Sequence, residues 1–215
     1  MRNRFRVSIG ECVELSTLFP QIALKPTYIA SDKGISSLEG RNLKRGYIQV
    51  YTGPGKGKTT AALGLALRAV GRGLRVCIIQ FMKCNKRAGE VQAAGLLAPR
   101  LSIYPMGPRG LIQGKPRPID YEMARSALDF SRNVIKEKAH DVVILDEVNM
   151  AVHFGLITVE DLLALMEDRP KSVELVLTGR DAHPKIIEKA DLVTEMLAVK
   201  EYYDKGVKAR KGIEE

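Results

Sequence analysis

The 215-residue chain contains no tryptophan, and aromatic residues make up only 6% of it. Its three cysteines, Cys12, Cys77 and Cys84, form no CxxC pair, so we expect no disulfide scaffold and a reducing, cytoplasmic location. No stretch approaches the roughly 18 consecutive apolar residues that a membrane-spanning helix needs, and we therefore expect no membrane partner. With 45% hydrophobic and 27% charged residues, the composition is that of an ordinary globular protein.

Acidic residues are in the minority, with 25 Asp and Glu against 34 Lys and Arg and a formal charge of +9. Residues 1–45 hold eight of the basic and four of the acidic groups, so nearly half of the excess lies in about a fifth of the chain. A basic excess concentrated in this way, without interleaved aromatic residues, is not typical of a nucleic-acid surface. We expect no nucleic-acid partner.

The chain divides into an irregular N-terminal arm, residues 1–45, and one domain, residues 46–215. The arm has no sustained periodicity, and we expect it to be partly disordered with at most one short helix near Gly10. In the domain, apolar runs typical of buried strands alternate with amphipathic segments, which predicts an α/β fold with a mostly parallel sheet and helices on both faces. We expect strands at 47–51, 74–81, 101–104, 141–146, 173–178 and 192–199, and helices at 59–70, 89–97, 119–138, 159–167 and 184–189.

The strongest motif is Gly-Pro-Gly-Lys-Gly-Lys-Thr-Thr at 53–60, between an expected strand and an expected helix. Such a glycine-rich turn cradles phosphates with backbone N–H groups, while Lys58 supplies a positive charge and Thr59 a hydroxyl ligand for Mg²⁺. The usual pattern places a glycine at position 52, which is Thr52 here, so the loop is one residue short. Polyphosphate binding and a P-loop, RecA-like fold follow from the motif. The ATP-binding residues that we expect are Gly53, Pro54, Gly55, Lys56, Gly57, Lys58, Thr59 and Thr60.

Two further segments end in polar groups. The apolar run at 142–145 leads into Asp146 and Glu147, and in P-loop proteins an acidic residue at this place holds Mg²⁺. The run at 176–178 leads into Gly179 and Arg180, where an arginine either faces nucleotide phosphates or lies on the surface in a turn. We expect Thr59, Asp146 and Glu147 to hold Mg²⁺ or Mn²⁺.

These motifs together resemble the P-loop type of ATP:corrinoid adenosyltransferase. The similarity covers roughly residues 46–214. It comprises the phosphate loop through Gly64, the segments 68–73 and 76–83, Leu-Asp-Glu at 145–147, Leu-Thr-Gly-Arg at 177–180, and the C-terminal pieces 193–200, 206–209 and 212–214.

The resemblance implies transfer of the 5′-deoxyadenosyl group of ATP to the Co(I) of a corrinoid, with release of triphosphate, in adenosylcobalamin synthesis or salvage. It also implies that ATP lies reversed in the loop compared with other P-loop enzymes. Because Co(I) is itself a strong nucleophile, Lys58, Glu147 and Arg180 would position and neutralise rather than abstract a proton. Arg68 matches a family position and either reaches the nucleotide or caps its helix. A homodimer and an electron-donating reductase or flavodoxin are the implied partners.

Two positions depart from the family pattern. Relatives commonly carry asparagine where this chain has Pro54. They place an aromatic pair, Phe-x-Trp, against the corrinoid where this chain has Leu111 and Gln113, and we expect these two residues to contact the corrinoid instead. The aromatic pair is associated with removal of the lower axial ligand, which eases reduction to Co(I).

Two other functions fit parts of the sequence. The basic balance and the Asp146-Glu147 pair also suit a RecA-like ATPase stimulated by nucleic acid. Pro54 and the missing aromatic pair also suit a regulatory module that binds ATP without turnover.

Overall fold

The computed structural model describes residues 43–110, 112 and 114–214. The expected arm, with its short helix near Gly10, lies outside these residues except for 43–45. Leu43 packs against the core of the domain, and the Arg45 guanidinium lies 5.0 Å from the centre of the Tyr47 ring.

The domain is built on one six-stranded sheet in which every neighbouring pair of strands is parallel. The strand order is β3-β2-β4-β5-β1-β6. The strand β1 thus lies between β5 and β6, and β1 and β2 are not neighbours in the sheet although they follow one another in the chain. All the carboxyl ends of the strands therefore meet along one edge, where ligands bind in open parallel sheets. The strands are β1 Ile48–Thr52, β2 Val76–Gln80, β3 Leu101–Pro105, β4 Val142–Asp146, β5 Glu174–Thr178 and β6 Leu192–Glu195.

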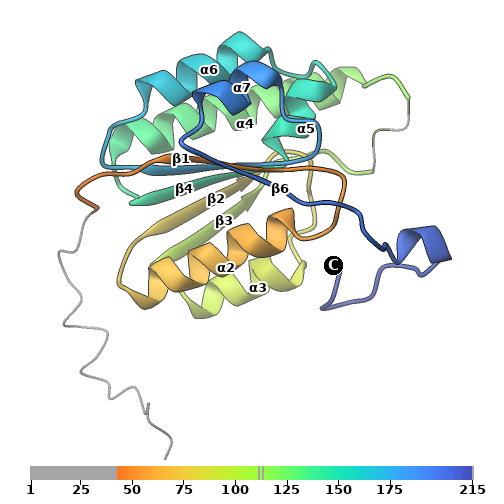
Figure 1. Cartoon of the computed structure of the whole chain (residues 1–215). Coiled ribbons are helices and arrows are strands. Elements are labelled where there is room, and N and C mark those ends of the chain that lie inside the picture. The colour runs from red at the N-terminus through yellow and green to blue at the C-terminus, as the bar shows by residue number, and fades with distance from the viewer. Residues whose placement is uncertain (1–42, 111, 113, 215) are drawn as a thin grey trace, which may run out of the picture. The chain divides into compact units, whose positions relative to one another are not determined.

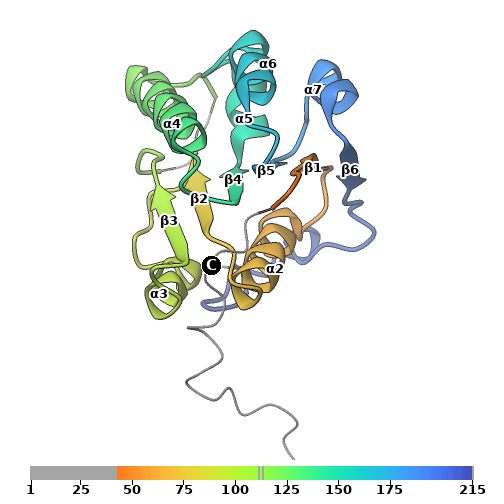
Figure 2. The same cartoon turned by 90° about the vertical axis from the view of Figure 1, so that its left-hand side faces the viewer.

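The helices cover both faces of the sheet, as the apolar strands require. Figures 1 and 2 show α4, α5, α6 and α7 on one face and α2 and α3 on the other. Every residue of β2 and β4 is buried, because these central strands have helices above and below them. The helices are α2 Lys58–Gly71, α3 Gly89–Leu96, α4 Pro118–Glu137, α5 Val148–His153, α6 Val159–Asp168 and α7 Pro184–Lys189.

Local sequence explains where two of these helices begin. Pro118 starts α4, where a missing N–H costs nothing, and Asp120 accepts hydrogen bonds from the Arg117 backbone and side chain. Thr158 precedes α6 and its hydroxyl accepts a hydrogen bond from Asp161 N at 3.0 Å. These contacts satisfy backbone N–H groups that have no partner inside the helix.

The hydrophobic core forms two clusters, one on each side of the sheet. The larger cluster joins the sheet to α4, α5, α6 and α7 and includes Leu128, Leu145 and Leu165. The smaller cluster lies under α2 and α3. The buried residues that α2 contributes to it are alanines, such as Ala62 and Ala66, so α2 lies close to the strands. The α2 N-terminus is thereby held against the carboxyl edge of the sheet.

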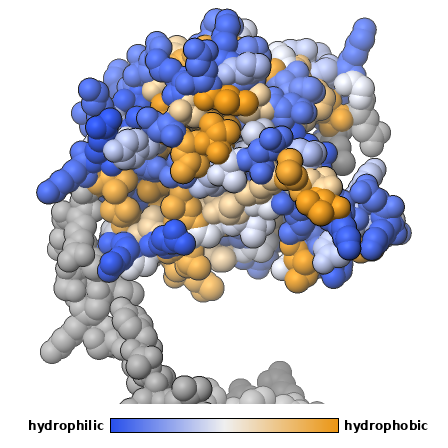
Figure 3. Space-filling view, in the orientation of Figure 1, coloured by the Kyte–Doolittle hydropathy of each residue, from blue (hydrophilic) through white to orange (hydrophobic). Residues whose placement is uncertain are grey.

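The strand β6 forms one edge of the sheet, and all four of its residues are exposed. Figure 3 shows apolar side chains gathered across the middle of this face of the molecule, with hydrophilic residues around them. Leu192 and Val193 of β6 are among the large exposed apolar residues. Among the described residues, no helix is both long enough and apolar enough to cross a membrane.

The structure confirms the expected alternation of strands and helices, with ends that differ by one or two residues for most elements. The expected strand at 192–199 is wrong in its length, because the chain leaves the sheet after Glu195. There Met196 O accepts a hydrogen bond of 2.7 Å from Gly55 N, which draws the chain across the phosphate loop. The helix α5 and a short 3-10 helix, η2 Tyr203–Lys205, were not expected from the sequence.

Candidate functional site

The glycine-rich segment forms the turn from β1 into α2, at the carboxyl edge of the sheet. Gly57 directly precedes α2 and has a φ of +123°, a conformation open to glycine but strained for other residues. In the described chain no side chain caps this helix, and its first turn carries no acidic residue. The first N–H groups of a 14-residue helix therefore point toward the loop and suit an anion.

Two of the loop glycines are required because the backbone of the segment after β6 passes close to them. A Cβ at Gly53 would lie 2.6 Å from Met196 O, and one at Gly55 would lie 2.5 Å from Leu197 O. Gly53 and Gly55 therefore lack a Cβ for a steric reason that does not depend on phosphate. They leave room for the backbone that follows β6, while Gly57 meets only the Met196 side chain.

Lys58 is buried and folds back onto its own loop. Its ammonium donates to Gly53 O at 2.8 Å and to Gly55 O at 2.7 Å. Burial lowers the pKa of Lys58, and the nearby Arg180 guanidinium lowers it further. The positive charge of Lys58 is thus costly without a ligand, and an arriving polyphosphate would relieve that cost.

Asp146 ends β4 and is the most densely hydrogen-bonded side chain of the site. It is 1% exposed. Its Oδ1 accepts from the hydroxyls of Thr59 at 2.9 Å and Thr178 at 2.7 Å. Its Oδ2 accepts from Lys83 Nζ at 2.8 Å and from Gln80 Nε2 at 3.3 Å. This carboxylate is held in place by four donors, which come from α2, from the ends of β2 and β5, and from the segment after β2.

Glu147 follows in the left-handed conformation, with a φ of +61°, and its side chain turns to the cavity. Its backbone N–H donates to Thr178 Oγ1 at 3.0 Å, which supports the unusual backbone. Burial raises the pKa of the Glu147 carboxyl, and the neighbouring Asp146 raises it further. The positive charges of Lys83, Lys58 and Arg180 lower the pKa of Glu147 and so oppose part of this rise.

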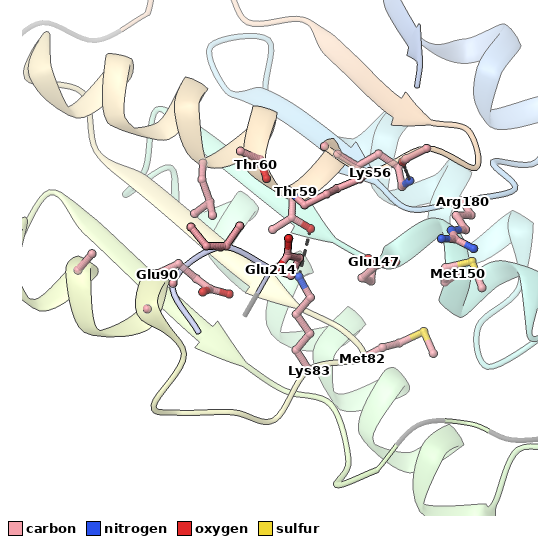
Figure 4. Close-up of a pocket in the computed structure, with 18 of the residues that line it drawn as sticks. Lys56, Thr59, Thr60, Met82, Lys83, Glu90, Glu147, Met150, Arg180 and Glu214 are labelled. Atoms are coloured by element: carbon pink, nitrogen blue, oxygen red, sulfur yellow. Dashed lines mark hydrogen bonds between the residues drawn. The ribbon is translucent and has the colours of Figure 1, made fainter. Parts of the chain in front are cut away.

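Lys58, Thr59 and Glu147 line one side of a cavity of about 960 Å³ (Figure 4). Its charged side includes the phosphate loop, the start of α2 and Arg180, which follows β5. Its other walls are largely apolar and come from α2, α3, α5 and the segments after β2 and β3. The apolar lining residues are Leu63, Leu67, Met82, Ala93, Leu97, Leu101, Pro108, Ile112, Met150, Phe154, Leu156 and Ile213.

The C-terminal segment completes the cavity. The Glu201 carboxylate accepts a hydrogen bond of 2.8 Å from Lys56 N, a backbone donor of the phosphate loop. Gly212, Ile213 and Glu214 also line the cavity, and both cartoon views place the C-terminus beside α2 (Figures 1 and 2). Arg210 lies 2.7 Å from Glu214 and holds the pKa of that carboxyl at about 2.

The donor set at Asp146 fits a hard divalent cation. The Thr59 hydroxyl and the Asp146 carboxylate supply oxygen ligands 2.9 Å apart, and Glu147 adds a second carboxylate at the cavity wall. The Lys83 ammonium lies between Thr59 and Asp146, so this place already accepts a positive charge. Within the described residues, no three His, Cys, Asp or Glu side chains form a metal-binding group by themselves.

Most of the expected site residues come together in this cavity. Asp146, Gly53 and Pro54 lie outside the lining, although Asp146 accepts a hydrogen bond from the lining residue Thr59. Arg68 is exposed in the last turn of α2 and also lies outside the lining. Burial raises the pKa of Tyr51, and the charge of Arg68 partly opposes this rise. The roles of all the expected residues in ATP and metal binding stay predictions. The expected residues that line the cavity are Gly55, Lys56, Gly57, Lys58, Thr59, Thr60, Glu147 and Arg180.

The expected corrinoid contacts Leu111 and Gln113 lie outside the described residues. Their neighbours Gly110 and Ile112 line the cavity.

Sequence reasoning missed Lys83 and the C-terminal carboxylates. A signal for Lys83 was available, because it follows a buried strand at the carboxyl edge of a parallel sheet, where ligand-binding residues gather. Glu201 has no comparable signal, since it is placed by the course of an irregular segment.

Comparisons with known proteins agree with this geometry. The sequence profile of the family "ATP:corrinoid adenosyltransferase BtuR/CobO/CobP" matches residues 44–214. The corrinoid adenosyltransferase of Pseudomonas aeruginosa is 35% identical over 171 residues, which are 80% of this chain and 84% of that protein. The Escherichia coli K12 corrinoid adenosyltransferase is 36% identical over 172 residues, which are 80% and 86% of the two chains.

Among solved structures, the KaiC-like protein PH0186 from Pyrococcus horikoshii aligns with a TM-score of 0.50 and 16% identity, covering 73% of this chain and 75% of that one. This likeness concerns the fold alone, and it confirms the expected P-loop, RecA-like α/β architecture. The match of the family profile over most of the chain confirms the resemblance expected from the motifs. The chain belongs to the ATP:corrinoid adenosyltransferase family.

Proposed function

We propose that this enzyme transfers the 5′-deoxyadenosyl group of ATP to the Co(I) of a reduced corrinoid. In this reaction the cobalt electron pair forms a bond to C5′, the bond between C5′ and its oxygen breaks, and triphosphate leaves with that oxygen. One observation carries the proposal. The residues that match the adenosyltransferase family enclose a cavity that combines a phosphate loop with extensive apolar walls. One end suits a triphosphate, and the walls suit the adenosine and the edge of a corrinoid.

The charged residues of the cavity suit a leaving group that carries several negative charges. Lys56, Lys58 and Arg180 supply three cations around the loop, and the α2 N-terminus adds backbone N–H groups. Because the nucleophile is already reactive, the protein's contribution would be to align C5′ with cobalt and with the leaving oxygen. Glu147 would then orient ligands rather than activate water.

Thr59, Asp146 and Glu147 would hold the divalent cation, Mg²⁺ or Mn²⁺. When bound, the cation would supply charge neutralisation on the phosphate oxygens. The hydrogen bond between Thr59 and Asp146 keeps two of these oxygen ligands adjacent before nucleotide binds. The loop, one residue shorter than usual, would accept ATP in the reversed orientation that the family resemblance implies.

A direct experiment supplies MgATP and a chemically reduced corrinoid and follows formation of the cobalt–carbon bond by absorbance. The phosphate product is identified in the same samples. One triphosphate released per bond formed is the expected result. Orthophosphate release that rises with added DNA or RNA would instead indicate the nucleic-acid-stimulated ATPase, and ATP binding with neither product would indicate a regulatory module.

We also propose that the enzyme acts in the cytoplasm as a homodimer and receives electrons from a separate reductase or flavodoxin. Among the described residues β6 is an edge strand of the sheet, and an exposed edge strand can pair with another chain. Sedimentation of the full chain tests the dimer, and a single species with the mass of one chain would contradict it.

A further inference from the structure

Lys83 is the one basic residue of the described chain that forms an ion pair with Asp146. Its ammonium lies 2.8 Å from Asp146 Oδ2 and 3.1 Å from Thr59 Oγ1. Figure 4 shows the side chain reaching across the cavity wall to Thr59. The ammonium therefore contacts both residues that are the strongest candidates for metal ligands.

The backbone of this lysine is fixed while its side chain has access to solvent. Gly107 N donates to Lys83 O at 2.8 Å, and a Cβ at Gly107 would lie 2.4 Å from Lys83 N, so the two segments are in close backbone contact. The Lys83 side chain remains 34% exposed, whereas Asp146 is 1% exposed. A long, partly exposed side chain on a fixed backbone can move its charge without rearrangement of the fold.

Two other cations of the cavity are held elsewhere. The Lys58 ammonium is bound by two loop carbonyls, and Arg180 extends from the end of β5 on another wall. A buried carboxylate such as Asp146 needs a positive partner, because an unpaired charge is costly in a poorly solvated place. Lys83 supplies this partner in the protein without nucleotide.

We propose that Lys83 is a tethered counter-ion that occupies the metal position until a metal–nucleotide complex arrives. The divalent cation then takes over Thr59 and Asp146, and the released ammonium turns to the triphosphate. Lys83 is thus a positioning residue that opposes binding of metal alone and favours binding of metal together with ATP. This inference rests on the proposed metal site.

The test measures Mn²⁺ binding by electron paramagnetic resonance, first with the metal alone and then with ATP, in the absence of corrinoid. The variant Lys83→Met removes the competing charge. We expect it to bind Mn²⁺ alone roughly tenfold more tightly than the unchanged protein does, and to bind ATP roughly tenfold more weakly in the presence of Mn²⁺. Lys86→Met is the matched control, because Lys86 is exposed and forms no ion pair among the described residues.

Two further variants keep the outcome decisive. Lys83→Gln retains a hydrogen-bond donor for Asp146 without the charge, and should reproduce the tighter Mn²⁺ binding if Lys83→Met folds poorly. Unchanged or weaker binding of Mn²⁺ alone in both variants would overturn the proposal. Asp146→Asn tests the metal site itself: if this variant binds Mn²⁺ with ATP as the unchanged protein does, the proposed site has failed. Loss of binding in Asp146→Asn combined with no effect at Lys83 contradicts only the counter-ion role.

Discussion

The Thr178 hydroxyl donates a hydrogen bond of 2.7 Å to Asp146 Oδ1. The same hydroxyl accepts a hydrogen bond of 3.0 Å from Glu147 N. One side chain at the end of β5 thereby fixes both acidic residues at the end of β4. Because Thr178 is buried, neither bond can be replaced easily by water.

Thr178→Val should therefore weaken both stability and transfer. The substitution leaves the Glu147 N–H without its partner and removes one of the two hydroxyl donors to Asp146 Oδ1, which costs about 1–3 kcal/mol. Urea unfolding and the rate of cobalt–carbon bond formation are the measurements. Thr178→Ser keeps the hydroxyl and should retain most of both properties, and equal losses in the two variants would show that the hydroxyl is not responsible.

Lys58→Ala should abolish transfer even when the corrinoid is supplied as Co(I). Supplying Co(I) removes any dependence on reduction, so the loss would report on the phosphate site. Loss of one well-placed electrostatic group typically lowers the rate by about 10²–10³-fold. Lys136→Ala, an exposed lysine in the last turn of α4, is the control and should behave as the unchanged enzyme does. Substantial activity in Lys58→Ala would mean that the triphosphate lies elsewhere.

Glu147→Gln should stabilise the nucleotide-free protein at neutral pH and lower its activity. Burial raises the pKa of Glu147 in the folded state, so the folded protein favours the protonated carboxyl. The stability from this group is present at low pH and is lost as the pH rises from the ordinary glutamate value through the folded pKa. Glutamine avoids the cost of the charged form.

The difference in melting temperature between Glu147→Gln and the unchanged protein should thus grow from pH 4 to pH 7. A gain of about 1 kcal/mol corresponds to roughly 2–4 °C for a chain of this size. Glu188→Gln on the exposed face of α7 is the control. A difference that is constant with pH would show that the ionisation of Glu147 is not its cause.

Glu201→Ala should strengthen ATP binding. The Glu201 carboxylate accepts a hydrogen bond from Lys56 N, a backbone donor that a phosphate oxygen would also use, and its negative charge faces the same anion site. Removing it leaves the donor free for ATP. Calorimetry with MgATP should give a several-fold lower Kd, with Asp204→Ala in η2 as the control. Weaker binding would indicate that Glu201 instead keeps the loop in its binding conformation.

Leu111→Phe combined with Gln113→Trp should accelerate the reaction that starts from Co(II). Gly110 and Ile112, which flank Leu111 in the sequence, line the cavity whose apolar walls would receive the edge of the corrinoid. Bulky aromatic side chains there would favour loss of the lower axial ligand and ease reduction. The rate from preformed Co(I) should be unchanged in the same double variant. No acceleration from Co(II) would argue against this placement of the family's aromatic pair.

Much of the fold follows from local patterns. The buried runs that become β2 and β4 are long, apolar and bounded by clear turn or helix signals, which makes their type unambiguous. The signal for α6 was equally clear, since Thr158 and Asp161 cap one another. The helix α5 was missed because it is only six residues long and begins directly after the strained Glu147.

The site was predictable where one short motif carries it and not where distant segments meet. The phosphate loop, Asp146 and Glu147 each follow an apolar strand, so topology alone brings them to one edge. The contacts of Lys83 with Thr59 and of Glu201 with Lys56 depend on the paths of irregular segments. Such paths are set by tertiary packing, which no local pattern records.

The phosphate loop and the segment after β6 are in close backbone contact, although they are far apart in the sequence. Substitutions in one of them therefore depend on the conformation of the other. A side chain can be added at position 55 only if the chain near Leu197 moves away, since the required space is filled by its carbonyl. The amino-acid sequence of the loop is therefore constrained by backbone atoms of the segment that follows β6. Homologues that differ at these glycines should also differ in the course of their C-terminal segment, and the two changes should appear together.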